Sequence, residues 1–112
     1  SGQACWEKTT FSCMQDQSIR NHLKEHDRTH IVLCGIETHV CVLQTALDLL
    51  ADGYNVHVIN DAVGSRTEKN RLSGLSMIQE AGGVVSSTEI AVFQWAGHSK
   101  HEAFRALSRL VR

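Results

Sequence analysis

Apolar and polar positions follow one another along the chain in blocks that are typical of strands and helices. Residues 31–36 form a continuous apolar run, the pattern of a strand buried on both faces of a sheet. Over residues 40–51 the apolar positions recur at helical spacing, and Gly53 follows where a glycine commonly ends a helix. Residues 56–59 again have the apolar character of a strand. The pattern therefore predicts a strand, a helix and a second strand.

The next part of the chain repeats this order. Ser65 and Glu68 have the spacing of a capping box, which predicts the start of a helix at this point. Two glycines at 82–83 end that helix, and residues 84–86 are predicted to form a third strand. A second capping box, Ser86 with Glu89, predicts another helix.

Both ends of the chain carry weaker signals. Residues 16–27 are predicted to form a short helix, and residues 4–7 the end of a strand. A third capping box, Ser99 with Glu102, predicts a last helix whose apolar face consists of Phe104, Leu107 and Val111.

Strands that alternate with helices indicate parallel βαβ units with right-handed crossovers. We therefore predict an α/β fold: a three-layer αβα sandwich with a parallel sheet of three to four strands. This is a small number of strands for such a fold, and the chain opens at the end of a strand. The prediction is a fold that lacks its N-terminal strands.

Composition narrows the classes of function. The chain has 112 residues, with 11 basic and 12 acidic side chains and a net charge of −1. This balance argues against a nucleic-acid partner and against a polybasic membrane module, and no apolar run reaches the roughly 18 residues of a spanning helix. The four cysteines form no CxxC pair, and no secretory signal opens the sequence. We predict free thiols and a cytoplasmic location, leaving a mitochondrial one open.

Cys41 is the first candidate for chemistry. In open α/β sheets, ligands bind at the carboxyl ends of the strands, and Cys41 falls in the first turn of the helix that follows such an end. Unpaired N–H groups and the helix dipole at that position stabilise a thiolate, and the same N–H groups can hold an oxyanion. The alternative is a small buried apolar residue.

Lys8 is the second candidate, because it lies at another predicted strand end. A lysine there favours the thiolate form of a neighbouring cysteine or stabilises a charged intermediate. The alternative is a solvated surface lysine.

Four segments together resemble the C-terminal part of the isochorismatase-like cysteine hydrolases. They are the K-x-x-F-S segment of Lys8, Phe11 and Ser12, the strand and turn VLCGIETHVCV, the segment DAVGSR, and STEIAVFQW. The similarity runs from Lys8 to about Trp95. It implies that residues 1–112 are the C-terminal portion of one isochorismatase-like hydrolase domain.

The resemblance also implies a site. Cys41 matches the nucleophile and Lys8 the lysine of a Cys-Lys-Asp triad. A cis peptide between Ile36 and Glu37 is implied, which turns the N–H groups of Glu37 and Cys41 toward an oxyanion. We further predict that substrate contacts Thr38, His39 and Phe11.

The implied reaction is hydrolysis of a small amide or related acyl compound through a thioester, without cofactor or metal, in a homo-oligomer. One part of the pattern is missing, because the family's aspartate precedes the lysine and no aspartate precedes Lys8 here. Glu37 and Asp16 are the candidate substitutes. The alternative function is a non-catalytic oligomerisation or interaction module that retains the fold. A flavodoxin-like ligand-binding domain is disfavoured, since no phosphate loop follows a strand.

Overall fold

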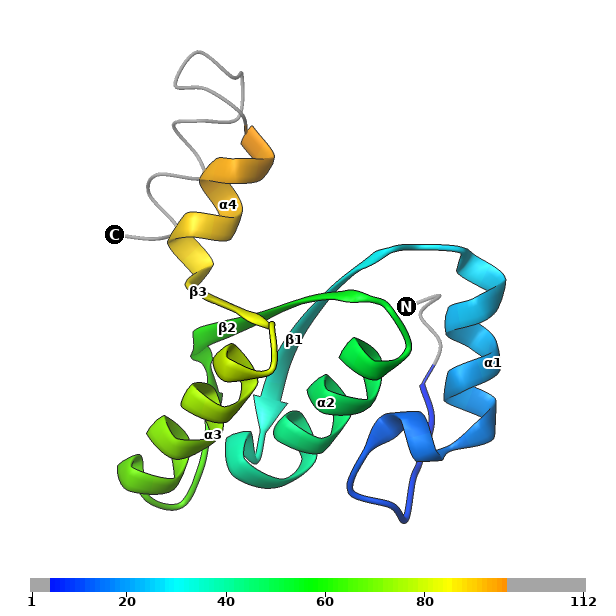
Figure 1. The fold of residues 1–112 in the computed structure, drawn as a ribbon, viewed down its shortest axis with the longest axis horizontal. Helices are drawn as coiled ribbons and strands as arrows, with labels where there is room; N and C mark the ends of the chain where they lie inside the picture. The colour runs from blue at the N-terminus through cyan, green and yellow to red at the C-terminus, as the bar shows by residue number, and fades with distance from the viewer. Residues whose placement is uncertain (1–4, 97–112) are drawn as a thin grey trace.

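A three-stranded parallel sheet organises the part of the chain that the computed structural model describes, residues 5–96 (Figure 1). The strands are adjacent in chain order: β1 (His30–Ile36), β2 (Asn55–Gly64) and β3 (Val84–Ser86). Each connection contains a helix, α2 (Leu43–Ala51) between the first two strands and α3 (Glu68–Glu80) between the last two. The predicted α/β class and the small parallel sheet are confirmed.

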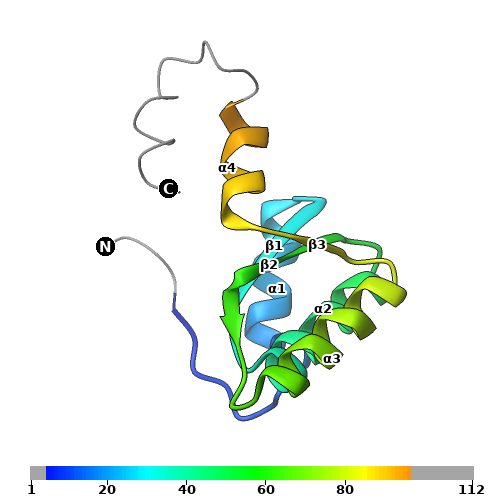
Figure 2. The same cartoon turned by 90° about the vertical axis from the view of Figure 1, so that its left-hand side faces the viewer.

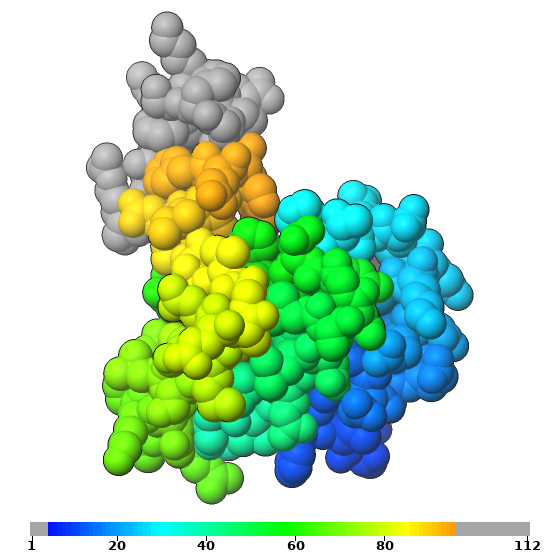
Figure 3. Space-filling view, viewed as in Figure 1, coloured from blue at the N-terminus to red at the C-terminus, as the bar shows by residue number. Residues whose placement is uncertain are grey.

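The helices lie on both sides of the sheet (Figures 1 and 2). α2 and α3 pack side by side on one face, and α4 (Thr88–Ala96) lies on the other side, beyond the end of β3. α1 (Gln17–His26) lies beside α2, and in the space-filling view α4 stands out from the body formed by the other helices (Figure 3). The buried core lies between the sheet and the α2–α3 layer; its most enclosed members are Ala46, Leu49, Val56, Val58 and Ile78.

Local hydrogen bonds and backbone conformations set both ends of α1 and the C-terminal end of α2, close to the predicted bounds. The Asp16 side chain accepts hydrogen bonds from the first turn of α1, and Asp27 ends that helix in the left-handed conformation. Gly53 has φ +90° directly after the C-cap of α2, a conformation that glycine adopts without steric cost. The helix predicted over 40–51 is regular only from Leu43, because a π-helical turn, Thr38–Val42, comes first.

Two predicted helix caps are wrong by one or two residues. Thr67, rather than Ser65, caps α3 by accepting a hydrogen bond from the Asn70 N–H. At α4 the hydroxyl of Ser87, rather than that of Ser86, accepts the Ile90 N–H at 3.1 Å. Helices tolerate several possible caps in a row, and the tertiary contacts of each hydroxyl decide which one is used.

β1 is more exposed than its apolar sequence predicts. Val32 is 46% exposed and Ile36 is 75% exposed. The reason is its position, because β1 is an edge strand of the described sheet and the described residues leave much of one of its faces uncovered. Residues 5–7 form no strand, contrary to the prediction for 4–7. The predicted helix after Ser99 lies outside the described residues.

Candidate active site

A sharp turn joins β1 to the helix that carries Cys41. We call residues 35–42 the elbow. Gly35 has φ +111°, and the peptide bond between Ile36 and Glu37 is cis. The Glu37 carbonyl oxygen then accepts the N–H groups of Val40 and Val42, each at 3.1 Å. These two bonds close the π-helical turn and place Cys41 at the carboxyl end of β1.

Lys8 and Cys41 meet at the elbow, although 33 residues separate them in the chain. The Lys8 Nζ lies 3.7 Å from the Cys41 Sγ, and it also donates a hydrogen bond to the Thr10 carbonyl oxygen at 2.8 Å. Both side chains are half-buried. The structure therefore brings together the two residues on which the predicted chemistry depends.

The loop after β2 is attached to the elbow by two polar contacts. Glu37 accepts the backbone N–H of Arg66 at 3.1 Å, and its carboxylate lies 3.6 Å from the Arg66 Nε. The His39 Nδ1 and the Ser65 Oγ are 2.8 Å apart. A pocket of about 430 Å³ lies between these segments, lined by Ile36, Glu37, Gly64, Ser65 and Arg66. Sequence reasoning missed the contact of Ser65, whose hydroxyl binds His39 rather than capping α3.

The other predicted substrate contacts differ in exposure. Phe11 is 60% exposed, whereas Thr38 is completely buried and its hydroxyl has no hydrogen-bond partner among the described residues. Thr38 and His39 lie against α3, where Gly74 leaves room: a Cβ there would be 2.9 Å from the Thr38 carbonyl oxygen. Of the three, His39 and Phe11 reach the surface of the described residues and Thr38 does not.

The carboxylates suggested as substitutes for the missing aspartate are engaged elsewhere. Asp16 caps α1 through the N–H groups of Ser18 and Ile19, and Glu37 pairs with Arg66. Within residues 5–96, Lys8 forms no ion pair with a carboxylate. In the same range there is no group of three metal-ligating side chains, and no helix has the length and hydropathy needed to cross a membrane.

Asp61 has a structural role at the end of β2. Its carboxylate accepts the backbone N–H and the hydroxyl of Thr88, each at 2.9 Å. The backbone hydrogen bond from Thr88 holds the pKa of the Asp61 carboxyl below its ordinary value. A lowered pKa means that this contact stabilises the fold above the ordinary carboxyl range and weakens as the pH falls through the lowered value. At neutral pH the Asp61 carboxylate therefore stabilises the position of the first residue of α4, Thr88.

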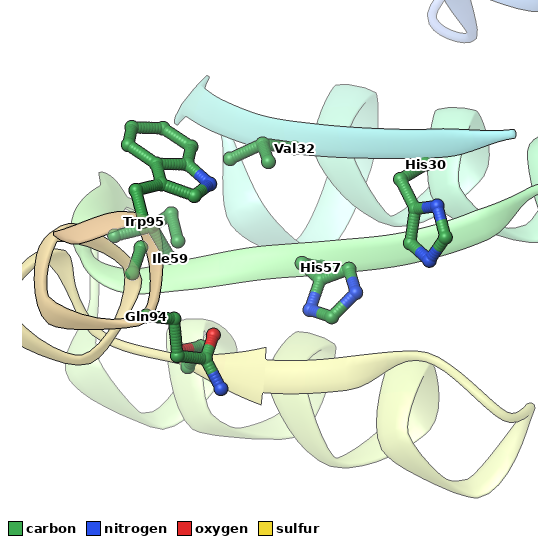
Figure 4. A pocket seen from close by; sticks show the side chains of 8 residues that line it. His30, Val32, His57, Ile59, Gln94 and Trp95 are labelled. Carbon is green, nitrogen blue, oxygen red and sulfur yellow. The ribbon is translucent and has the colours of Figure 1, made fainter. Parts of the chain in front are cut away.

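A second pocket lies on the face of the sheet opposite α2 and α3 (Figure 4). It has a volume of about 260 Å³, and His30, His57 and Trp95 are among its lining residues. Ser86 also lines it, and within residues 5–96 its buried hydroxyl has no hydrogen-bond partner. The two imidazole rings have their centroids 6.0 Å apart. This pocket therefore lies on the opposite side of the sheet from α2, the helix that follows the elbow.

Comparison with known proteins identifies the family. The sequence profile of the Isochorismatase domain matches residues 1–90. The chain belongs to the isochorismatase family. It is 43% identical over 109 residues to a secreted isochorismatase effector, Isc1, of Phytophthora sojae, a match that covers 96% of this chain and 51% of that protein.

Solved structures of the family have the same fold. The MAR1 ribonuclease from Caenorhabditis elegans is 38% identical and superimposes with a TM-score of 0.81, over 93% of this chain and 53% of that one. The pyrazinamidase/nicotinamidase from Streptococcus mutans is 30% identical with a TM-score of 0.66, over 70% of this chain and 44% of that one. The chain thus spans about half the length of the isochorismatase relatives it matches.

Proposed function

We propose that this chain carries the nucleophile of a hydrolase that cleaves a small amide or a related acyl compound. The observation that carries the proposal is the 3.7 Å contact between the Lys8 Nζ and the Cys41 Sγ at the carboxyl end of β1. An ordinary thiol is only a few per cent thiolate at neutral pH, so a cysteine nucleophile needs such a cation beside it. Similarity to a pyrazinamidase/nicotinamidase supports an amide as the substrate class.

The proposed reaction has two steps. The Cys41 thiolate attacks the carbonyl carbon, and the N–H groups of Glu37 and Cys41 stabilise the oxyanion that forms. The carbon–nitrogen bond breaks, and the nitrogen takes a proton from the Lys8 ammonium as it leaves. Water then attacks the thioester and the carbon–sulfur bond breaks. The carboxylic acid departs, one water proton returns to Lys8, and the thiolate is restored.

Residues 1–112 are proposed to be the C-terminal portion of one hydrolase domain, and the carboxylate that pairs with Lys8 to lie on a segment that this chain lacks. Support comes from the length of the relatives, of which the chain spans about half. Substrate is proposed to bind beside His39 and Phe11, in a homo-oligomeric protein that needs no cofactor.

Trapping the acyl intermediate tests the proposed function. The purified protein is mixed with p-nitrophenyl acetate, quenched in acid and digested, and the acetylated cysteine is located by tandem mass spectrometry. The expected result is acetylation of Cys41, lost in Cys41→Ala and retained in Cys34→Ala. The second variant is the matched control, because Cys34 lies seven residues away and is more exposed. Acetylation of Cys34 and Cys41 to the same extent contradicts the proposal and favours a non-catalytic module.

A further inference from the structure

The segment that carries Lys8 lies along the helix that follows Cys41. Residues 5–8 have no strand partner among the described residues, so Lys8 is not held in place by the sheet. Instead, three side chains of the elbow and α2 contact residues 8–13, which we call the lysine segment. Cys41 contacts Lys8 at 3.7 Å, Thr45 accepts the Cys13 N–H at 2.9 Å, and Asp48 accepts the Ser12 hydroxyl at 2.6 Å.

The spacing of these three residues explains the arrangement. Cys41, Thr45 and Asp48 are four and three residues apart, which places them along one face of a helix. The face that presents the proposed nucleophile is therefore the same face that binds the lysine segment. The position of the lysine segment relative to Cys41 therefore depends on the contacts of Thr45 and Asp48, one and two turns further along the helix.

Asp48 makes the shortest of these contacts. One of its carboxylate oxygens accepts the Ser12 hydroxyl at 2.6 Å and the Gln15 Nε2 at 3.2 Å. Ser12 is 2% exposed, and its oxygen also accepts the Met14 N–H at 3.1 Å. A hydroxyl that donates to a carboxylate and accepts a backbone N–H is fixed in both position and orientation.

Local hydrogen bonds link Ser12 to Lys8 through Thr10. The Thr10 hydroxyl donates to the Ser12 carbonyl oxygen at 2.8 Å, and the Lys8 Nζ donates to the Thr10 carbonyl oxygen at 2.8 Å. A continuous series of contacts therefore joins Asp48 to the Lys8 ammonium. We propose that Asp48 is a positioning residue, which through Ser12 sets the Lys8 ammonium beside the Cys41 sulfur. This inference rests on the proposed function.

The test measures alkylation of Cys41 by iodoacetamide between pH 6 and pH 9 in the purified protein. We expect Asp48→Ala and Ser12→Ala each to slow the reaction at pH 7 by about tenfold, since small displacements in a site cost one to two orders of magnitude in rate. At pH 9, where an ordinary thiol is largely ionised, the variants should approach the wild-type rate. Asp48→Asn retains a carbonyl acceptor for Ser12 and should recover part of the rate at pH 7.

A purely electrostatic role for Asp48 predicts the opposite sign. Removing a negative charge near a thiolate would accelerate alkylation at pH 7 rather than slow it. Asp52→Asn is the matched control, because Asp52 lies at the end of the same helix and pairs with Arg20 at 2.6 Å without touching Ser12. It should leave Cys41 alkylation unchanged.

The outcomes separate this inference from the proposed function. If Asp48→Ala and Ser12→Ala are folded by circular dichroism and alkylate at the wild-type rate, Asp48 has no positioning role. The same holds if both lose reactivity equally at pH 7 and pH 9, since that pattern reports general damage to the site. If wild-type Cys41 itself shows no enhanced reactivity at pH 7, it is the proposed function that fails.

Discussion

Replacing Lys8 by alanine is expected to slow alkylation of Cys41 at pH 7 by about 10- to 100-fold, the range in which an adjacent opposite charge changes an ionisation equilibrium. The Lys8 ammonium lies 3.7 Å from the Cys41 sulfur. The measurement is the rate of iodoacetamide incorporation at Cys41, followed by mass spectrometry.

Lys24→Ala is the control for this prediction, because Lys24 is an exposed lysine in the last turn of α1. It removes the same charge from the protein without touching the elbow. If Lys8→Ala and Lys24→Ala alkylate at equal rates, the contact between Lys8 and Cys41 has no chemical consequence.

A methyl group at Gly74 is expected to displace the elbow. The Cβ of an alanine there would lie 2.9 Å from the Thr38 carbonyl oxygen and 3.0 Å from the His39 Cα, and both are backbone atoms that cannot rotate away. Overpacking of this kind costs about 1–3 kcal/mol, against a gain of about 1 kcal/mol in helix propensity. Gly74→Ala should therefore lower the melting temperature by a few degrees and slow Cys41 alkylation severalfold.

Ser76→Ala, at an exposed position of the same helix, separates the effect of overpacking from that of helix propensity, because it changes helix propensity without approaching the elbow. It should raise the melting temperature slightly and leave Cys41 reactivity at the wild-type level. A Gly74→Ala protein that melts higher than wild type would show that the elbow tolerates the methyl group.

The parts of the fold that depend on local signals were predictable from sequence. Asp16 caps α1 and Gly53 ends α2 because each acts on backbone groups within a few residues of itself. The position of Cys41 at a strand end also followed from local pattern. The place of Lys8 near a predicted strand end made it a candidate, and resemblance to a family supplied its pairing with Cys41 and the cis bond before Glu37.

The parts that depend on distant contacts were not predictable. The Ser65 hydroxyl is engaged by His39, 26 residues earlier, so Thr67 takes over the cap of α3. Nothing near Asp48 in the sequence shows that it binds Ser12, 36 residues away. The helical spacing of Cys41, Thr45 and Asp48 can be read from the sequence, but their contacts with the lysine segment cannot.

The rate of alkylation of the four cysteines in the wild-type protein at pH 7 tests most directly whether Cys41 is an activated nucleophile. Cys5 and Cys34 are exposed, whereas Cys13 and Cys41 are half-buried, so access alone predicts that Cys5 and Cys34 react first. We expect Cys41 to react first, by about tenfold or more, because a thiolate is the reacting species. Alkylation of Cys5 and Cys34 ahead of Cys41 would contradict it.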